Sequence, residues 1–326
     1  MRFDRMKRRD FVALLGAAAA WPVTRPLTAR AEPAVAVVKS TPFDPRITPA
    51  RPDLAAKHLA GSVEAARYVE GQVFEIGAAT SPLRSAPSNE ATLQTEALKG
   101  ERMTVYETSE TGWAWGQLAG DGYVGYVPAS TLRAPGPAAT HKVTALRTFT
   151  YPGPSIRLPP TETLSFGSRL AVARVDGPFA ITAAGGHVPV LHLAPTAALE
   201  TDFVAIAERF VGTPYLWGGK TSLGLDCSGL AQLALNACGI ACPRDTDMQE
   251  QALGSALTRP NALDQLRRGD LVFWKGHVAI VRDDATVVHA NASGHMAVAL
   301  EPIVEALPRI RAIAGNITSV RRLTPA

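Results

Sequence analysis

The chain has 326 residues, of which 46% are hydrophobic and 19% charged, so it can bury hydrophobic cores and is not a wholly disordered chain. Its net charge of +4 lies at one end: residues 1–31 contain seven Lys or Arg and two Asp, a net of +5, and the remaining residues have a net of −1. The folded body is therefore not expected to bind nucleic acid. The length favours about two domains, or three small ones.

Residues 1–31 have the order of an export signal. A basic stretch, Lys7-Arg8-Arg9, precedes an apolar run from Phe11 to Trp21, and Ala29-Arg30-Ala31 offers a small-x-small cleavage site. This apolar run is too short for a membrane-spanning helix, and the sequence after it contains no apolar run of greater length. The text KRRDFVALLGAAAA resembles a twin-arginine signal. We expect a protein exported to the periplasm, or a cytoplasmic one if the signal is not used; an ordinary amphipathic arm is the alternative.

Residues 32–70 are rich in Pro and Ala and predict an extended lead-in with at most one short helix. From residue 71 to residue 198 the chain has short β-type runs separated by Gly, Pro and Asp. The strands expected here are Met103–Tyr106, Trp113–Leu118, Tyr123–Val127, Leu170–Val175 and His187–Leu193.

This β-rich region contains an internal repeat. The text GERMTV from Gly100 resembles GSRLAV from Gly167, and GYVP from Gly125 resembles GHVP from Gly186. Two copies of roughly 60 residues predict two small β-barrels, residues 71–135 and 136–198, with the Pro/Gly-rich RAPGPAAT as linker. The segment DGYVGYVPASTL, with GERMTVYE upstream, resembles a bacterial SH3-like domain; the second copy resembles it less.

Residues 199–326 predict an α+β domain, because helical periodicity is followed by a run of strands. Helices are expected at Asp202–Val211 and Cys227–Cys238. The expected strands are Leu271–Trp274, His277–Val281, Thr286–Ala290 and Met296–Glu301.

Cys227 stands at the predicted start of a helix and is the candidate nucleophile. Apolar residues follow it at helical spacing, Asp226 or its neighbour can cap the helix, and Gly239 can end it. The positive end of the helix dipole and the free N–H groups are expected to lower the pKa of the thiol. The same N–H groups could stabilise an oxyanion. The alternative is a small buried core residue.

A nucleophilic thiol needs a base, and two histidines lie on neighbouring predicted strands. His277 would take the thiol proton, and His289 would hold the other ring nitrogen of His277. For the rings to share one face of the sheet, the turn between the strands must contain an odd number of residues, such as Arg282–Asp284. The alternative is two structural histidines.

Residues from about 200 to 310 resemble the NlpC-type cysteine peptidases, small papain-like enzymes that cut cell-wall peptides. The matching text is GTPYLWGGKTSLGLDCSGL, CPRDTDMQ, LRRGDLVFWKGHVAIV and VVHANA. The resemblance implies Cys227 as nucleophile, His277 as base and His289 as third polar residue. It also implies Tyr215 near the oxyanion. Asp226, Ser228 and Thr246 would line the substrate side of the pocket.

Two SH3-like units before such a domain resemble the γ-D-glutamyl-L-diamino-acid endopeptidases. In that family the first barrel narrows the cleft, so that peptides with a free N-terminal L-Ala fit. An acid and a Tyr of the barrel, with the Asp beside the nucleophile, hold the ammonium group. The matches here are Glu96, Tyr123 and Asp226. Alternatively, Glu96 is a solvated acid and Tyr123 a core ring of the barrel.

The expected reaction is hydrolysis of the γ-D-glutamyl–diamino acid bond of peptidoglycan stem peptides, with no metal and no organic cofactor. The alternatives are a hydrolase, amidase or acyltransferase acting on intact wall or another substrate, and a wall-binding module with a silent peptidase domain. The partner is a peptidoglycan-derived peptide, with no nucleic acid and no integral membrane segment, and we expect a monomer. Cys238 and Cys242 predict core packing, with a bridge between them as the alternative.

Overall fold

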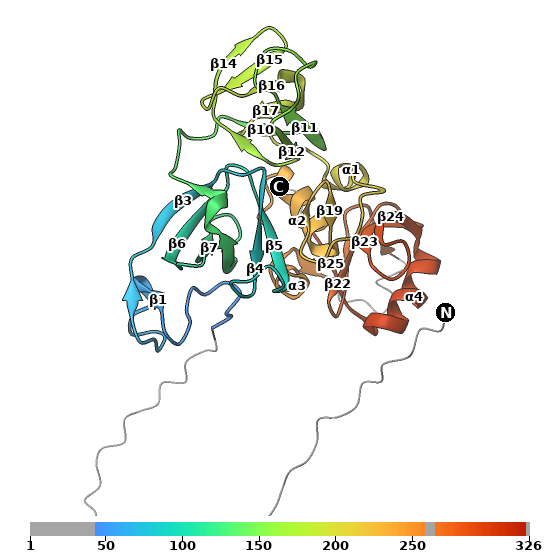
Figure 1. Ribbon diagram of the computed structural model, residues 1–326. Coiled ribbons are helices and arrows are strands. Elements are labelled where there is room, and N and C mark those ends of the chain that lie inside the picture. Colours follow the sequence, from blue (N-terminus) through green and yellow to red (C-terminus); the bar gives the residue numbers. More distant parts are fainter. Residues whose placement is uncertain (1–42, 258–264, 324–326) are drawn as a thin grey trace, which may run out of the picture. The chain divides into compact units, whose positions relative to one another are not determined.

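The computed structural model describes residues 43–257 and 265–323 (Figure 1). The predicted export signal lies outside these residues, as do residues 32–42 of the lead-in. Residues 43–70 are largely turns, bends and irregular backbone, with three short elements: β1 (Ala55–Ala56), the 3-10 turn η1 (Lys57–Leu59) and β2 (Tyr68–Val69). Among the described residues, no helix combines the length and hydropathy that a membrane span requires.

The first β-rich region forms a seven-stranded antiparallel sheet in the order β5-β4-β8-β7-β6-β3-β9. Its core gathers the inward-facing residues of these strands, including Leu83, Met103 and Val127. The strands are β3 (Gln72–Ile76), β4 (Thr80–Arg84), β5 (Leu93–Leu98), β6 (Arg102–Thr108), β7 (Trp113–Leu118), β8 (Val124–Pro128) and β9 (Leu132–Arg133).

The second β-rich region forms three small sheets of antiparallel strands. It repeats one detail of the first region: a strand, a 3-10 turn and a strand follow one another in β8-η2-β9 and again in β16-η3-β17, where the sequence repeat places GYVP and GHVP. The elements are β10 (His141–Val143), β11 (Arg147–Thr150), β12 (Glu162–Ser165), β13 (Arg169–Leu170), β14 (Val172–Asp176), β15 (Phe179–Thr182), β16 (His187–Pro189), η3 (Val190–His192) and β17 (Leu193–Pro195), with η2 at Ala129–Thr131.

The last region has helices on a six-stranded antiparallel sheet in the order β20-β25-β21-β22-β23-β24. The helices are α1 (Phe203–Glu208), α2 (Cys227–Ala237), α3 (Thr246–Ala252) and α4 (Ile303–Ala314). The strands are β20 (Ser255–Ala256), β21 (Leu271–Trp274), β22 (His277–Val281), β23 (Thr286–Asn291), β24 (Ala297–Pro302) and β25 (Ile317–Arg322), with a small hairpin of β18 (Lys220–Thr221) and β19 (Gly224–Leu225) before α2.

Sequence periodicity predicted β7, β21 and β22 with the observed bounds and α2 to within one residue. It missed α3, whose sequence TDMQEQA has no apolar stripe, and α4, which contains Pro308. A proline inside a helical pattern ordinarily argues against a helix.

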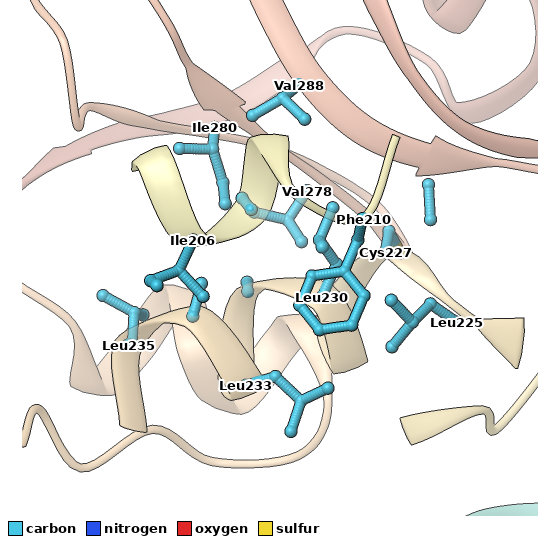
Figure 2. Packing of buried hydrophobic residues seen from close by; sticks show 14 of the residues in the cluster. Ile206, Phe210, Leu225, Cys227, Leu230, Leu233, Leu235, Val278, Ile280 and Val288 are labelled. Atoms are coloured by element: carbon cyan, nitrogen blue, oxygen red, sulfur yellow. The ribbon is translucent and has the colours of Figure 1, made fainter. Parts of the chain in front are cut away.

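Helix α2 is buried on nearly all sides and packs against α1 and β22 (Figure 2). Phe210, Leu230 and Val278 belong to this cluster, and so does Cys227. Gly229 permits a close approach here, because a Cβ at this position would lie 2.3 Å from the backbone oxygen of Gly219. The loop before α2 therefore packs directly on the first turn of the helix.

Replacing Gly229 by Ala should lower the free energy of unfolding by about 1–3 kcal/mol, because the clash is with backbone that cannot move aside cheaply. Gly120→Ala is the matched control, since a Cβ there meets nothing within 4 Å. Urea unfolding of both variants measures the difference. Equal stabilities of Gly229→Ala and Gly120→Ala would contradict the close approach.

Candidate active site

Asp226 fixes the start of α2 and so positions Cys227, the next residue. Its Oδ1 accepts a 2.7 Å hydrogen bond from the N–H of Gly229 and a 3.2 Å bond from Oγ of Ser228. Its Oδ2 accepts a 2.9 Å bond from the N–H of Gly218. The carboxylate therefore caps the helix and ties the preceding loop to it.

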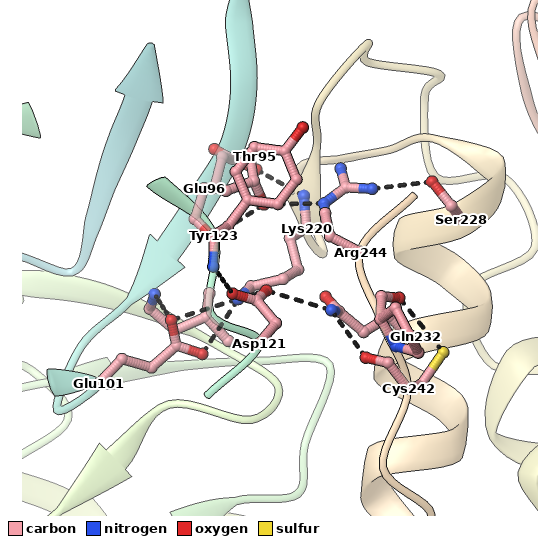
Figure 3. A network of polar contacts seen from close by, with 12 residues as sticks. Thr95, Glu96, Glu101, Asp121, Tyr123, Lys220, Ser228, Gln232, Cys242 and Arg244 are labelled. Atoms are coloured by element: carbon pink, nitrogen blue, oxygen red, sulfur yellow. Dashed lines mark hydrogen bonds and ion pairs between the residues drawn. The ribbon is translucent and has the colours of Figure 1, made fainter. Parts of the chain in front are cut away.

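Arg244 neutralises Asp226 in a largely buried ion pair. Figure 3 shows the further contacts of Arg244 with Thr95 and Ser228. Nη1 and Nη2 of Arg244 lie 2.9 and 2.8 Å from the two carboxylate oxygens of Asp226, and its Nε donates to Thr95 of β5 at 2.8 Å. The prediction that Asp226 holds a substrate ammonium needs correction. Its carboxylate lies at the cleft, but five hydrogen bonds already occupy its oxygens.

Cys227 is 6% exposed, and its thiol donates to the carbonyl oxygen of Gly276 at the long distance of 4.0 Å. Burial and the charge of Asp226 raise the pKa of Cys227 to about 12, although N–H groups of Val278 and Ser228 act in the opposite direction. The expected lowering by the helix N-terminus is therefore wrong for this buried thiol, because desolvation outweighs it. In the resting protein the thiol is protonated.

The register of β22 and β23 brings the two predicted histidines together. Ile280 pairs with Val288 and Val281 with Val287, so an odd number of residues connects the strands and His277 and His289 share one face. Nε2 of His277 lies 2.9 Å from Nδ1 of His289. The predicted odd number of residues in the turn between β22 and β23 is therefore confirmed, and the turn is centred one residue later than expected.

Glu301 at the end of β24 continues this chain of side chains and was missed by the sequence analysis. Its Oε2 lies 2.9 Å from Nε2 of His289, and Arg309 of α4 donates from Nε to Oε1 at 2.9 Å. Burial opposes ionisation, but the bonds from His289 and Arg309 lower the pKa of Glu301 to about 2. Strand alternation could have found it, because Ala299 pairs with His289 and Glu301 lies on the same face.

These contacts determine which ring nitrogens carry hydrogens. An ionised Glu301 only accepts, so Nε2 of His289 carries a hydrogen and its Nδ1 accepts from Nε2 of His277. Nδ1 of His277 is then free to take a proton. Burial and the neighbouring His289 lower the pKa of His277 to about 3, so the ring is neutral near neutral pH.

A cleft of about 230 Å³ opens beside the thiol. Four of the predicted substrate residues line it besides Asp226: Tyr215, Ser228, Thr246 and Tyr123. Residues not predicted also line it: Arg46, Gln94, Trp217, Asp245, Asp247 and Gly276. The hydroxyl of Tyr123 donates to Asp245 at 3.0 Å. Barrel and peptidase residues therefore share one cleft.

Glu96 is not among the residues that line this cleft, which corrects its predicted role. Its carboxylate accepts a 2.8 Å hydrogen bond from the backbone N–H of Lys220, and burial raises its pKa. Asp245 is the acid that Tyr123 contacts. It directly precedes Thr246, which the sequence did predict at the cleft.

Cys238 and Cys242 are both free thiols. The predicted core packing is confirmed for Cys242, which lies in the core around α2, but not for Cys238, which is half-buried and outside that cluster.

Two family models match parts of this chain. The description "NlpC/P60 family" matches residues 212–307, and "Bacterial dipeptidyl-peptidase Sh3 domain" matches residues 83–132. The probable endopeptidase NlpC of Escherichia coli is 32% identical over 113 residues, which cover 30% of this chain and 70% of that protein. The chain belongs to the NlpC/P60 family. It contains an NlpC/P60 peptidase domain and one matched SH3 domain; the family model does not extend to the second β-rich region.

Two dipeptidyl-peptidases show similarity over part of their length. Dipeptidyl-peptidase 6 of Lysinibacillus sphaericus is 37% identical over 98 residues, and the γ-D-glutamyl-L-lysine dipeptidyl-peptidase of Bacillus subtilis is 31% identical over 139 residues. The matched residues are 30% and 38% of this chain and span 35% and 44% of those proteins. A crystal structure of an NlpC/P60 family protein from Bacillus cereus has the same fold, with a TM-score of 0.63 and 20% identity over 78% of this chain and all of the other.

Replacing Glu301 by Gln should lower kcat for a γ-D-glutamyl peptide by roughly 10- to 100-fold, the effect of losing a charged hydrogen bond, and leave KM unchanged. The amide can accept from His289 but carries no charge, and the residue does not line the cleft. The control is Glu305→Gln, an exposed acid of α4. Steady-state kinetics that show a raised KM with an unchanged kcat would contradict this role.

The lowered pKa of His277 predicts that the stability of the protein depends on pH. Its pKa is about 3 when folded and 6.5 ordinarily, so its contribution is complete above pH 6.5 and is lost as the pH falls toward 3. The free energy of unfolding should therefore fall more steeply over this range for the wild type than for His277→Gln. Urea unfolding at a series of pH values measures both slopes, with exposed His58→Gln as control. Identical slopes for the wild type and His277→Gln would contradict the lowered pKa.

Proposed function

We propose that this NlpC/P60 peptidase is a cysteine peptidase that hydrolyses the γ-D-glutamyl–diamino acid bond of peptidoglycan stem peptides with a free N-terminal L-Ala. One observation carries the proposal. The thiol of Cys227, at the capped start of α2, lines a cleft with an acidic wall and contacts the carbonyl oxygen of Gly276, the residue before His277, at which the chain His277–His289–Glu301 begins. A nucleophile, a base, an orienting group and a receptor for a cation are all present.

In the first step, Sγ of Cys227 attacks the γ-carbonyl carbon while its proton passes to Nδ1 of His277. The raised pKa of Cys227 and the lowered pKa of His277 both oppose this transfer in the resting protein, so the proton moves as the bond to the substrate forms and not before. The backbone N–H groups at the start of α2 can bind the resulting oxyanion. His289 and Glu301 stabilise the imidazolium.

In the second step, the C–N bond breaks and the amine of the diamino acid leaves with the proton of His277. The γ-glutamyl group is then a thioester on Cys227. A water molecule loses a proton to His277 and attacks the thioester, which releases L-Ala-D-Glu and returns the proton to the thiol. No cofactor enters either step.

The acidic wall supports selection of a free amine. Oδ2 of Asp245 accepts hydrogen bonds from the hydroxyl of Tyr123 and the guanidinium of Arg46. Its Oδ1 accepts no hydrogen bond from any side chain or backbone group of the described residues. An ammonium group would complete Oδ1 with a charge-assisted hydrogen bond. The names of the Bacillus relatives, γ-D-glutamyl-L-lysine dipeptidyl-peptidases, agree with this class of substrate. We propose a periplasmic location from the sequence of residues 1–31 alone.

The direct test is incubation with L-Ala-γ-D-Glu-L-Lys and with L-Ala-γ-D-Glu-diaminopimelate. The wild type should release L-Ala-D-Glu, and Cys227→Ala should release none, because the nucleophile is gone. Cys238→Ala is the matched control, since this half-buried free thiol lies outside the cleft, and it should retain wild-type turnover. Chromatography of the products measures release.

Persistent cleavage by Cys227→Ala would contradict the mechanism. Absence of cleavage by the wild type with either peptide would contradict the proposed substrate class, and in that case turnover of intact cell wall would favour the alternative hydrolase.

A further inference from the structure

The N-terminal lead-in is held against the first barrel just where it passes the cleft. The carbonyl oxygen of Arg46 accepts a 2.7 Å hydrogen bond from the N–H of Val124, and that of Ile47 accepts a 2.8 Å bond from the side chain of Gln117. The backbone at residue 46 is thus fixed to β7 and β8, and the side chain of Arg46 lines the cleft. This wall of the cleft comes from neither predicted barrel nor from the peptidase domain.

The guanidinium of Arg46 bridges the lead-in to the start of α3. Nη1 lies 2.8 Å from Oδ2 of Asp245 and 2.8 Å from Oδ1 of Asp247, and Nη2 lies 2.6 Å from Oδ2 of Asp247. Asp44 binds the other edge of the guanidinium, with Nη2 2.7 Å from its Oδ2. Each nitrogen of the guanidinium therefore has a carboxylate partner.

These contacts leave Asp245, which precedes α3, and Asp247, in its first turn, in different states. Asp247 faces the fork of Arg46 with both oxygens, the geometry in which a guanidinium and a carboxylate satisfy each other. Asp245 uses only Oδ2, which Arg46 shares with Tyr123, and its Oδ1 has no hydrogen bond from the described residues. One cation among three carboxylates leaves a net charge of −2, so the site still attracts a cation.

We propose that Arg46 is a specificity-determining residue: it holds Asp245 with one oxygen toward the cleft and blocks that end, so that the enzyme requires a free substrate amine. This rests on the proposed function, whose acid receptor is Asp245. Arg46 has three effects: it orients the receptor, it neutralises the neighbouring Asp247 that would otherwise offer a competing site, and it fills space that a longer or capped peptide would need.

The test compares kcat/KM for L-Ala-γ-D-Glu-L-Lys with kcat/KM for the same peptide acetylated at its N-terminus. The ratio of the two is independent of how much of each preparation is folded. In Arg46→Ala the ratio should fall about tenfold or more, mainly through a raised KM for the free-amine peptide, as expected for the loss of charged hydrogen bonds at its receptor. The ratio for Arg46→Lys should lie between those of the wild type and Arg46→Ala, because an ammonium group cannot form the two parallel hydrogen bonds of a guanidinium.

Arg51→Ala is the matched control. Arg51 anchors the same lead-in through Asp53, Glu107 and the ring of Trp115 but does not line the cleft. Its ratio should remain within about twofold of the wild type, a change well below one charged hydrogen bond. An unchanged ratio in Arg46→Ala, faster cleavage of the free-amine peptide by that variant, or an equal fall in Arg51→Ala would each overturn the role of Arg46. If the wild type cleaves neither peptide, the proposed function fails, and the inference about Arg46 fails with it. If the wild type cleaves the free-amine peptide faster than the acetylated one, the variants test the role of Arg46 separately from the proposed function.

Discussion

The buried pair of Arg244 and Asp226 is the interaction on which the rest of the site depends. A guanidinium only 1% exposed is costly to bury, and it is tolerable only if its donors are satisfied. Thr95, Asp226, Ser228 and the Gly219 carbonyl provide the acceptors, so the first barrel, the loop before α2 and the first turn of α2 must all be in place at once. Cys227 lies inside this arrangement, and its backbone has little freedom to move.

The same burial sets the chemistry of the nucleophile. In a poorly hydrated position both the thiolate and the imidazolium are disfavoured, which explains why the pKa of Cys227 is raised while that of His277 is lowered. The charge that appears during attack must therefore be stabilised by groups already in place. Glu301, itself held by Arg309, supplies a negative charge at the far end of the histidine pair. In the proposed mechanism, proton transfer is thereby coupled to substrate binding.

The sequence predicted the parts of the site that depend on local rules. A helix cap before Cys227 and the parity of one turn were sufficient to place the nucleophile and the two histidines, because 3.6 and 2 residue periods determine which side chains share a face. Glu301 obeys the same rule. The alternation of side chains along β24 was therefore sufficient to predict that Glu301 shares a face with His289.

The acidic end of the cleft could not be predicted in this way. Arg46 and Asp245 are 199 residues apart, and no periodicity connects them. The predicted role of Glu96 failed for the same reason, since the position of a residue in the sequence does not tell where its carboxylate points. Glu96 binds the backbone of Lys220 instead. The second β-rich region was predicted in part. The sequence showed that it repeats motifs of the first region, but not that its strands form three small sheets.

The most direct test of the account is a crystal structure of the Cys227→Ala variant with bound L-Ala-γ-D-Glu-L-Lys. The account predicts the γ-glutamyl carbonyl carbon beside position 227, within reach of Nδ1 of His277, and the peptide amine within hydrogen-bond distance of Oδ1 of Asp245. A peptide bound with its amine pointing away from Asp245, or with its scissile carbonyl remote from position 227, would contradict it.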